Sequence, residues 1–432
     1  MKIHPLYRAL GMAMAIGLTM PTAMADSTPT AKQTSQSLAQ LIQWAIDNDR
    51  GLQRIEYQAN AQTDLGIANS QLMDPTLKMG VGGLPTDSFS FDDDPMTNIS
   101  VGLMQQFGRG NTLALQQKQS NQQADSIRQS SGVRELDITK AITTAWIELA
   151  YLNQASLLMQ ENQALFKELA NYLGTNYGLG NNQSQDLIQS ELQISKIDEQ
   201  LQANQQMQLK LKAQLTEWLG DKARLIQAHS YPQWQTLAQF LNTHPQDYYP
   251  ALASHPAIKV TNAMIASSET GVEIANEAYQ PQFGVEVMYA YRQANGMDGS
   301  PASDLVSTFV TMDIPLFTEK RQDKKVSAAQ YQVGAARTQR DLVLQQMNSQ
   351  VNASVVDRDN TQQRLSRYQQ VLLKHAQEKA NAVERGYQNN TNQLDEYIKA
   401  ASDVLTIKLE QARLEADVQQ ANNTLSYLLN KY

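Results

Sequence analysis

The sequence lacks cysteine altogether: none occurs among its 432 residues. Disulfide bonds, a lipid anchor carried on cysteine and a thiol nucleophile are therefore excluded. The five histidines show no spacing typical of metal ligands. The glycines of residues 80–83 are followed by Leu-Pro, not by the Lys-Ser of a phosphate loop. We therefore expect no catalytic site, no cofactor and no bound metal.

Long hydrophobic runs are missing as well. The apolar stretch Ala9–Met20 follows the cations Lys2 and Arg8 and precedes a small-x-small cleavage site at residues 23–25. Residues 1–25 are therefore predicted to be a secretory signal peptide. No later segment approaches the roughly 20 apolar residues of a membrane helix. The exported chain is expected in the periplasm, outside the cell or in the outer membrane as a β-barrel.

Aromatic residues and basic residues are both scarce. Aromatics make up 7% of the chain, and 35 Lys and Arg face 43 Asp and Glu. Removal of the signal peptide takes away Lys2 and Arg8 but no acid, so the mature net charge is 33 − 43 = −10. Because phosphate binding needs clustered cations, nucleic acid is not an expected partner. The abundance of Gln, Asn and Ala predicts long polar helices instead of one large globular core.

An internal repeat is the main feature that is present. An Ile-Ala-Asn triplet occurs at residues 67–69 and 274–276, each time followed by a proline and two alternating stretches that end at Phe107 and Phe317. A period near 200 residues is too long for a solenoid, so we predict a duplicated unit of strand pair plus helical hairpin. The expected organisation is a first repeat over 26–219 (strand pair about 76–107, hairpin 112–219), an irregular equatorial linker over 220–256, and a second repeat over 257–432 (strand pair about 282–317, hairpin 318–430).

The alternating stretches predict membrane strands. Leu77, Met79 and Val81 alternate with polar or small residues, and the stretch from Phe283 to Tyr291 does the same. Such alternation over about 10 residues, with aromatics near the ends, is typical of an outer-membrane strand. A half-buried soluble sheet would show the same pattern, but the flanking helices are too polar to cover one.

Four strands are too few for a barrel. Only a closed barrel satisfies every backbone group in lipid, and single barrels begin at about 8 strands. Two copies of the chain would supply 8 strands and three would supply 12. Glycines and small polar residues on the predicted lumen side favour the wider assembly.

The rest of the chain is predicted to form coiled coils. Apolar residues recur at three- and four-residue spacing from Ile142 onward and again near the C-terminus, which predicts left-handed supercoiling. The segment Thr112–Tyr172 would be about 92 Å long. The return helices are shorter, so the helix before each strand pair is expected to complete the length by stacking end to end with them.

A turn motif occurs in both copies. Tyr177 and Gly180 precede Asp186, and 210 positions later Tyr387 and Asn390 precede Glu396. Each copy alone fits ordinary turn and capping residues, with the acid in a first helical turn where the helix dipole favours it. Its presence in both copies predicts a mouth or docking surface. Between the first two strands, the acids Asp92, Asp93 and Asp94 predict either an acidic ring at the outer mouth or a solvated loop.

The hairpin signature Tyr-x-x-Gly-x-x-x-x-x-Asp at residues 177–186 resembles the TolC-type outer-membrane efflux factors, over nearly the whole mature chain. Asp74-Pro75-x-Leu77 and Gly102-Leu103-x-Gln105 resemble the branch of CusC- and CzcC-like heavy-metal efflux ducts. Relatives in that branch often carry a lipidated N-terminal cysteine, which this chain lacks.

This resemblance implies an α+β membrane protein. It would be a homotrimer whose 12-stranded β-barrel, four strands per chain, continues into a 12-helix periplasmic α-barrel. The protein would lie in the outer membrane of a Gram-negative bacterium and dock to a periplasmic adaptor (membrane fusion) protein and an inner-membrane pump. The expected function is a passive exit duct, gated at its periplasmic tip, for metal ions or small toxic compounds. The alternatives are the exit duct of a type I protein secretion system and a soluble periplasmic coiled-coil adaptor or spacer.

The resemblance also implies roles for particular residues. Asp186 and Tyr387 match polar partners that hold the closed tip together, and Glu396 matches a ring of acids at the constriction. Lys399 stands where some relatives have a second acid, and Asn392 where relatives can have an arginine of the closing network. The residues that match adaptor-contacting tips are Leu179, Gly180, Asn181, Asn389, Asn390 and Thr391.

Overall fold

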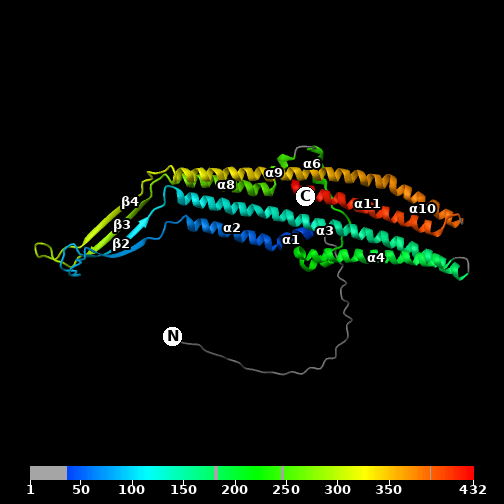
Figure 1. Ribbon diagram of the computed structural model, residues 1–432, viewed down its shortest axis with the longest axis horizontal. Helices are drawn as coiled ribbons and strands as arrows, with labels where there is room; N and C mark the ends of the chain where they lie inside the picture. Colours follow the sequence, from blue (N-terminus) through cyan, green and yellow to red (C-terminus); the bar gives the residue numbers. More distant parts are fainter. Residues whose placement is uncertain (1–36, 180–182, 245–247, 390) are drawn as a thin grey trace, which may run out of the picture. The chain divides into compact units, whose positions relative to one another are not determined.

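The computed structural model describes residues 37–179, 183–244, 248–389 and 391–432; the predicted signal peptide lies outside them. The first copy consists of α1 (Leu38–Asp47), α2 (Arg50–Asn69), β1 (Thr76–Gly82), β2 (Asn98–Gln106), α3 (Thr112–Gly178) and α4 (Ser184–Gln214). The second copy consists of α8 (Pro256–Glu277), β3 (Phe283–Tyr291), β4 (Leu305–Met312), α9 (Gln322–Arg367), the π-helical turn η2 (Tyr368–Leu372), α10 (Leu373–Gln388) and α11 (Leu394–Leu429). Figure 1 shows the strands joined to the long helices of both copies.

The four strands form one antiparallel sheet in the order β1-β2-β3-β4. The pairing of β2 with β3 joins the two copies, while β1 and β4 each have a single neighbour. β4 ends at Met312, five residues before the predicted end at Phe317. Pro315 follows closely, and proline cannot donate a hydrogen bond to a strand ladder.

The register places mostly apolar residues on one face of the sheet and a mixture of polar, small and apolar residues on the other. One row contains Met79, Val101, Tyr289 and Val306; the adjacent row, on the other face, contains Lys78, Gly102, Met288 and Ser307. Side chains of the first row are exposed in the single chain. On the second face, the Nζ atom of Lys78 lies 2.6 Å from Oε2 of Glu286, whose side chain is buried. The alternation predicted from the sequence therefore corresponds to two distinct faces.

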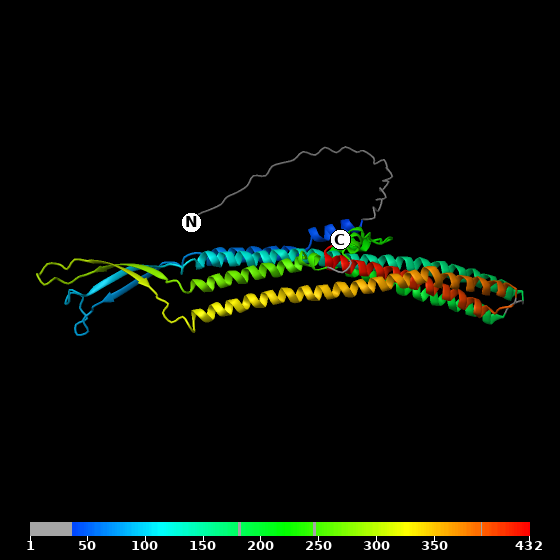
Figure 2. The ribbon, with the colours of Figure 1, turned by 90° about the horizontal axis from the view of Figure 1, so that it is seen from above.

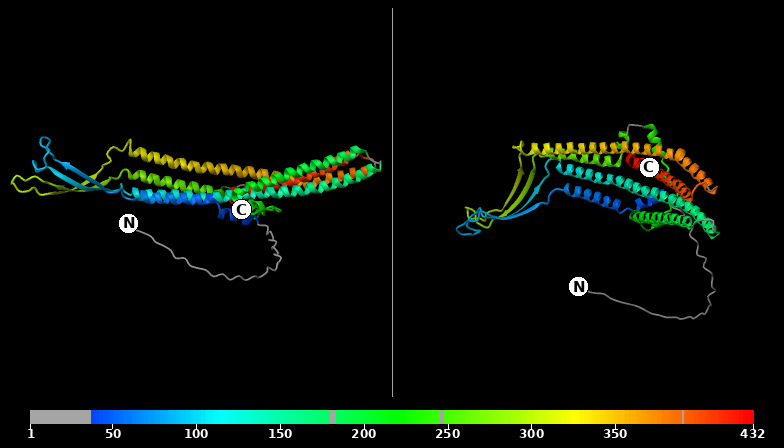
Figure 3. Two further views of the ribbon diagram at one scale, coloured as in Figure 1. Left: turned by 90° about the horizontal axis from the view of Figure 1, so that it is seen from below. Right: turned by 45° about the vertical axis from the view of Figure 1, so that its right-hand side comes forward.

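The long helices lie side by side in a fixed order. α3 packs against α2 and α4 along different parts of its length, and α9 packs likewise against α8 and α11. Contacts of α3 with α8 and with α11 join the two copies. Figure 3 shows α2 and α4 following α3 one after the other, as α8 and α11 follow the α9–α10 segment. The expected end-to-end completion of the return helices is thus present in both copies.

Local signals explain where these helices begin. Ser37 and Gln40 form a reciprocal capping box at α1. Asp49 caps α2 by accepting from the backbone N–H of Leu52 at 2.7 Å, and His255 caps α8 by accepting from Ala257. None of the described helices combines the length and the hydrophobicity required to cross a membrane.

The linker over residues 220–256 is more regular than predicted. It contains η1 (Gly220–Leu225), α6 (Gln235–Thr243) and α7 (Tyr249–Ala253), and α5 (Thr216–Leu219) precedes it. Leu237 and Leu252 are fully buried against residues of α9 and α11, including Val351 and Leu425. The short helices form because their apolar side chains complete small cores beside the long helices.

Candidate functional site

The two helical turns form the candidate site. α3 ends at Gly178 with Leu179 as its C-cap, and α10 ends at Gln388 with Asn389 as its C-cap. The returning helices α4 and α11 carry Asp186 and Glu396 in their first turns. Both acids therefore lie at the positive end of a helix dipole, as the turn motif predicts.

An apolar core beneath the turns holds the two hairpins together. Phe166 and Leu173 of α3 are fully buried and belong to one cluster with Ile197, Leu394 and Tyr397. Because this cluster combines α3, α4 and α11, the tips of the two copies are positioned relative to each other by packing. This packing also sets the relative positions of the polar side chains at the tips.

Asp186 and Tyr387 line the same groove, although they are 201 positions apart in the sequence. The groove has a volume of about 950 Å³ and lies between residues of α3, α4, α10 and α11. The rings of Tyr387 and Tyr397 stack with centroids 6.0 Å apart and planes at 8°. Within the described residues, the side chains of Asp186 and Tyr387 form no hydrogen bond. Within one chain, the two side chains thus line the same groove but do not hydrogen-bond to each other across it.

The groove disfavours ionised tyrosine. Burial raises the pKa of Tyr387, and the negative charge of Asp186 raises it further. Burial likewise raises the pKa of Tyr397, with a contribution from Glu384. Both phenols therefore stay protonated at neutral pH, and Tyr387 remains available to donate a hydrogen bond.

Lys399 and Glu396, on neighbouring turns of α11, have different surroundings. Lys399 lines a second groove, of about 720 Å³, together with Asp395 and residues of α4. Glu396 instead accepts a hydrogen bond from Nδ2 of Asn392 at 2.7 Å. The structure thus brings Glu396 to Asn392 and leaves Lys399 exposed and without an ion pair among the described residues.

Gly386 closes the second turn, a role that the sequence reading missed. Its carbonyl accepts from the backbone N–H groups of Thr391 and Asn392 at 2.8 and 3.2 Å, and from the Thr391 hydroxyl at 2.9 Å. A Cβ atom at Gly386 would lie 2.0 Å from Oδ1 of Asn392. The sequence difference that could have identified Gly386 is its position directly before Tyr387, because the first copy has Asn176 at the corresponding position.

The predicted tip residues are exposed wherever they are described. Leu179 is 71% exposed, and Asn389 and Thr391 are also exposed. Gly180, Asn181 and Asn390 lie outside the described residues. Leu179 is therefore a large apolar side chain presented to solvent at the end of a helix.

The acids of the β1–β2 loop have separate surroundings. Asp92 accepts from the Ser90 hydroxyl, and Asp94 caps a turn by accepting from the backbone N–H of Met96 at 2.8 Å. Asp92 and Asp93 are exposed, and Asp94 is half-buried. Asp94 thus has a structural role, which leaves Asp92 and Asp93 as the solvent-facing acids.

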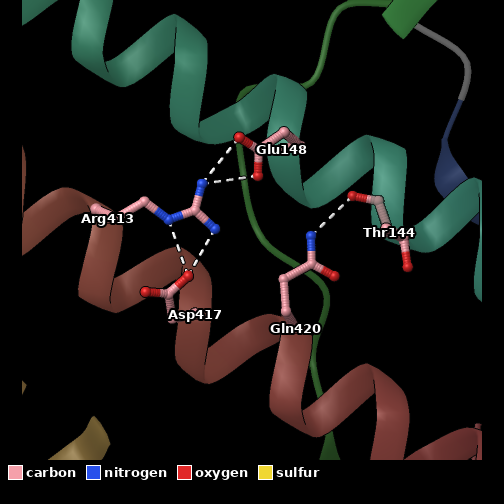
Figure 4. Close-up of polar contacts among 5 residues, drawn as sticks. All are labelled: Thr144, Glu148, Arg413, Asp417 and Gln420. Atoms are coloured by element: carbon pink, nitrogen blue, oxygen red, sulfur yellow. Dashed lines mark hydrogen bonds and ion pairs between the residues drawn. The ribbon is translucent and has the colours of Figure 1, made fainter.

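A charged cluster joins the two copies between the sheet and the tips (Figure 4). One guanidinium nitrogen of Arg413, on α11, lies 2.8 Å from Glu148 of α3, and another lies 2.6 Å from Asp417. Burial opposes the charged form of Arg413, but the hydrogen bonds to Asp417 and Glu148 outweigh it and raise its pKa. Gln420 donates to the carbonyl of Thr144 at 2.9 Å. No spacing in the sequence indicated this long-range clamp.

Metal ligands are not gathered anywhere in the described part of the chain. No group of three or more His, Asp or Glu side chains there could hold a metal ion. The grooves at the tips are lined by amides, tyrosines, apolar side chains and a few charged groups of Lys, Asp and Glu. Their chemistry suits reversible polar contacts between helices.

Comparisons with known proteins agree with this architecture. Residues 248–431 match the family model described as outer membrane efflux protein, and no curated protein sequence matches the chain. A membrane protein from Pseudomonas aeruginosa is similar in structure (TM-score 0.73, 15% identity, 95% of this chain and 99% of that chain covered). So is the outer membrane protein VceC from Vibrio cholerae (TM-score 0.72, 16% identity, 91% and 96% covered).

CusC is similar to nearly the same degree, with a TM-score of 0.71, 14% identity and 92% of each chain covered. These values do not separate one branch of channels from another, so the CusC- and CzcC-like branch stays a prediction. At such identities the likeness shows the fold. The predicted fold class, a strand sheet joined to long helical hairpins, is confirmed.

Proteins of the matched family are efflux channels and not enzymes, in agreement with the expectation for this sequence. The family model covers the second copy, and the channel fold extends over both copies. Residues 248–431 therefore resemble the outer membrane efflux protein family, and the chain as a whole shares the fold of the similar structures.

Proposed function

We propose that this chain is one subunit of a homotrimeric exit duct that crosses the outer membrane and extends into the periplasm. The sheet carries this proposal, because it has one exposed and mostly apolar face, an opposite face of mixed polar, small and apolar residues, and two edge strands with one neighbour each. Backbone groups at such edges must be paired in lipid. Pairing β4 of one copy with β1 of the next would satisfy both edges, and three copies would give a 12-stranded barrel with an aqueous lumen.

Cysteine pairs test the subunit contact, since the natural chain contains no cysteine to confuse the result. We would combine Met79→Cys on β1 with Val306→Cys, Thr308→Cys or Val310→Cys on β4. Oxidation of membranes is expected to give covalent dimers and trimers for at least one pair. Met79→Cys with Val101→Cys is the matched control, because these neighbours should cross-link within one chain. A monomeric mass for every edge pair would disprove the shared barrel.

We place the gate of this duct at the helical tips. The grooves contain Asp186, Tyr387 and Lys399 on helices from both copies, so their polar groups are available to groups of a neighbouring subunit. Glu396, held by Asn392, would supply one carboxylate per chain to the constriction. Opening would then require these polar contacts to break while the apolar core below them stays packed.

Conductance in planar bilayers tests the gate. The double variant Asp186→Asn with Tyr387→Phe should increase the conductance of a closed channel several-fold, because each change removes one polar partner but keeps the side-chain shape. Asp221→Asn with Tyr249→Phe in the linker is the matched control and should leave conductance unchanged. If both double variants conduct as the natural protein does, Asp186 and Tyr387 are not gate residues.

We further propose that the exposed tips dock a periplasmic adaptor protein and that an inner-membrane pump selects the cargo. The described tip residues Leu179, Asn389 and Thr391 are all exposed, which supports a docking role. Metal ions or small toxic compounds are the proposed cargo, as the family resemblance implies. A strain lacking this gene should become sensitive to such compounds, and Leu179→Asp should reproduce the sensitivity while the protein still reaches the outer membrane.

A further inference from the structure

Four cations follow the sheet at the start of α9. Lys320, Arg321, Lys324 and Lys325 are all exposed, and within the described residues none of their side chains makes a hydrogen bond or an ion pair. Residues 319–325 also contain Glu319 and Asp323, so the segment carries a net charge of 4 − 2 = +2. The mature chain as a whole is acidic. This cluster is therefore a local reversal of charge.

Helix stability does not explain the cluster. Cations in the first turn oppose the helix dipole and so destabilise the helix. The corresponding helix of the first copy, α3, has no cation before Lys118, and Lys118 pairs with Glu273 at 2.8 Å. Arg109, just before α3, forms an ion pair with Asp313 and donates to the carbonyl of Gln280 at 2.6 Å. Cations at the same level thus form ion pairs in the first copy, whereas among the described residues those of the second copy form none; Arg321 has only a longer-range attraction to Asp313.

An exposed apolar segment lies directly before the cluster. Leu316 and Phe317 are 72% and 89% exposed, and Ile314 is exposed too. They continue from the apolar face of β4 toward α9, and Figure 2 shows this segment crossing from the end of the sheet to the first turn of that helix. The nine residues of β3 span about 27 Å, close to the roughly 25 Å apolar band of a barrel. The cations therefore lie where such a band would end.

We infer that Lys320, Arg321, Lys324 and Lys325 bind the phosphate headgroups of anionic phospholipids at the periplasmic surface of the outer membrane. This inference rests on the proposed membrane position of the sheet. Leu316 and Phe317 would enter the acyl region, and the cations would face the headgroups. Basic residues beside a membrane are attracted to anionic lipid headgroups.

A neighbouring copy of the chain is the competing occupant. In a closed barrel the start of α9 would approach the α2–β1 connection of the next subunit, where Asp74 is exposed. One carboxylate would lower the net charge of residues 319–325 only from +2 to +1. Charge complementarity therefore favours the lipid surface.

Lipid quenching of a site-specific label tests the inference. The cysteine-free chain, carrying Leu316→Cys with a fluorophore, would be reconstituted in phosphatidylcholine vesicles that contain spin-labelled phosphatidylglycerol or spin-labelled phosphatidylcholine. Phosphatidylglycerol should quench about threefold more strongly, and the preference should vanish in the quadruple Lys/Arg→Gln variant of the cluster. Gln replacements at Lys210, Lys212, Lys374 and Lys408, within the hairpins, are the matched control and should keep the preference.

A second label tests the membrane position of the sheet independently of the anionic-lipid site. A fluorophore at Val310→Cys, on the apolar face of β4, should be quenched equally by both lipids in every variant. Absence of quenching at Val310 would overturn the membrane position itself. Quenching at Val310 with no lipid preference at Leu316 would overturn only the anionic-lipid site. Quenching at Val310 but by neither lipid at Leu316 would mean that a neighbouring subunit covers the cluster.

Discussion

The two copies of the repeat differ most in their longest helices. In the first copy α3 runs without interruption for 67 residues. In the second copy the corresponding path is divided into α9 and α10 by the π-helical turn η2. Such turns hold one extra residue and often mark functional positions. Duplicated hairpins with the same turn motif therefore need not be mechanically equivalent.

Contacts on α11 coincide with this interruption. The hydroxyl of Tyr368 donates to Glu410 at 2.9 Å, one turn from Arg413, which is clamped to α3. Closer to the C-terminus, Asn423 donates to the carbonyl of Lys140 at 3.1 Å. α11 is therefore fastened to α3 beyond this level, and its other half follows α10 toward the tip. We expect the second hairpin to bend at η2.

Single-residue deletions should affect the long helices of the two copies most differently. Gln160 of α3 and Gln370 of η2 are both exposed and stand 210 positions apart, the spacing of Tyr177 and Tyr387. Deleting Gln370 should restore a regular helix with its flanking faces in place, so trimers should form. Deleting Gln160 should rotate the rest of α3 by about 100° and carry Phe166 and Leu173 out of their core.

Trimer yield after detergent extraction measures the difference. We expect nearly normal yield without Gln370, near-complete loss without Gln160, and a lower open probability in bilayers for the Gln370 deletion. If both deletions lower the trimer yield equally, η2 does not hold an extra residue that can be removed without rotating the flanking helix.

Removal of the clamp should have the next largest effect. Arg413→Met leaves Glu148 and Asp417 facing each other without a cation, and it should lower the free energy of unfolding by about 2 kcal/mol, a value reduced for partial solvent exposure. Chemical denaturation measures it. Arg340→Met, which removes an exposed pair with Asp341, is the control. Adding Glu148→Gln and Asp417→Asn to Arg413→Met should recover part of the loss; no recovery would argue against unpaired charge as the cause.

The caps of α2 and α8 should respond to acid in different pH ranges. Burial lowers the pKa of His255 from 6.5, so the stability from its neutral cap is complete above pH 6.5 and is lost as the pH falls through the lower folded-state value. The hydrogen bond from Arg134 lowers the pKa of Asp49 from 3.8, so its contribution is complete above pH 3.8 and is lost below that. Acidification should therefore loosen the second copy first.

Amide hydrogen exchange, corrected for the intrinsic effect of pH, measures this smallest difference. Between pH 7 and pH 5 the first turn of α8 should lose about 1 kcal/mol of protection, while the first turn of α2 keeps its own. His255→Asn, which retains a capping acceptor, should abolish the response. A similar loss at both helices would contradict the assignment of the pH response to His255.

Much of the fold could be read from periodicity. The alternation around Met79 and Tyr289 predicted two faces, and the register places these residues in one apolar row. The long helices and the stacked return helices also followed from spacing and length. The short helices of the linker were missed, because Leu237 and Leu252 become buried only against helices distant in the sequence.

The candidate site could be located from the sequence but not assembled. The repeated turn motif marked Asp186, Tyr387 and Glu396, and it placed both acids in first helical turns. The shared groove of Asp186 and Tyr387 depends on how α4 and α10 pack. The pairing of Glu396 with Asn392 is local, yet several rotamers of these side chains are compatible with the sequence.

By itself, the sequence determined the duplicated architecture, because polar and apolar residues that recur at period two or near 3.5 leave a strand or a helix only one way to bury its apolar face. The structural differences between the two copies are visible only in the tertiary structure. The Arg413 clamp, the interruption at η2 and the cations at the start of α9, which form no ion pair among the described residues, all depend on contacts made or missing between residues far apart in the chain. Such contacts depend on the relative positions of packed elements, which spacing along a single segment does not encode.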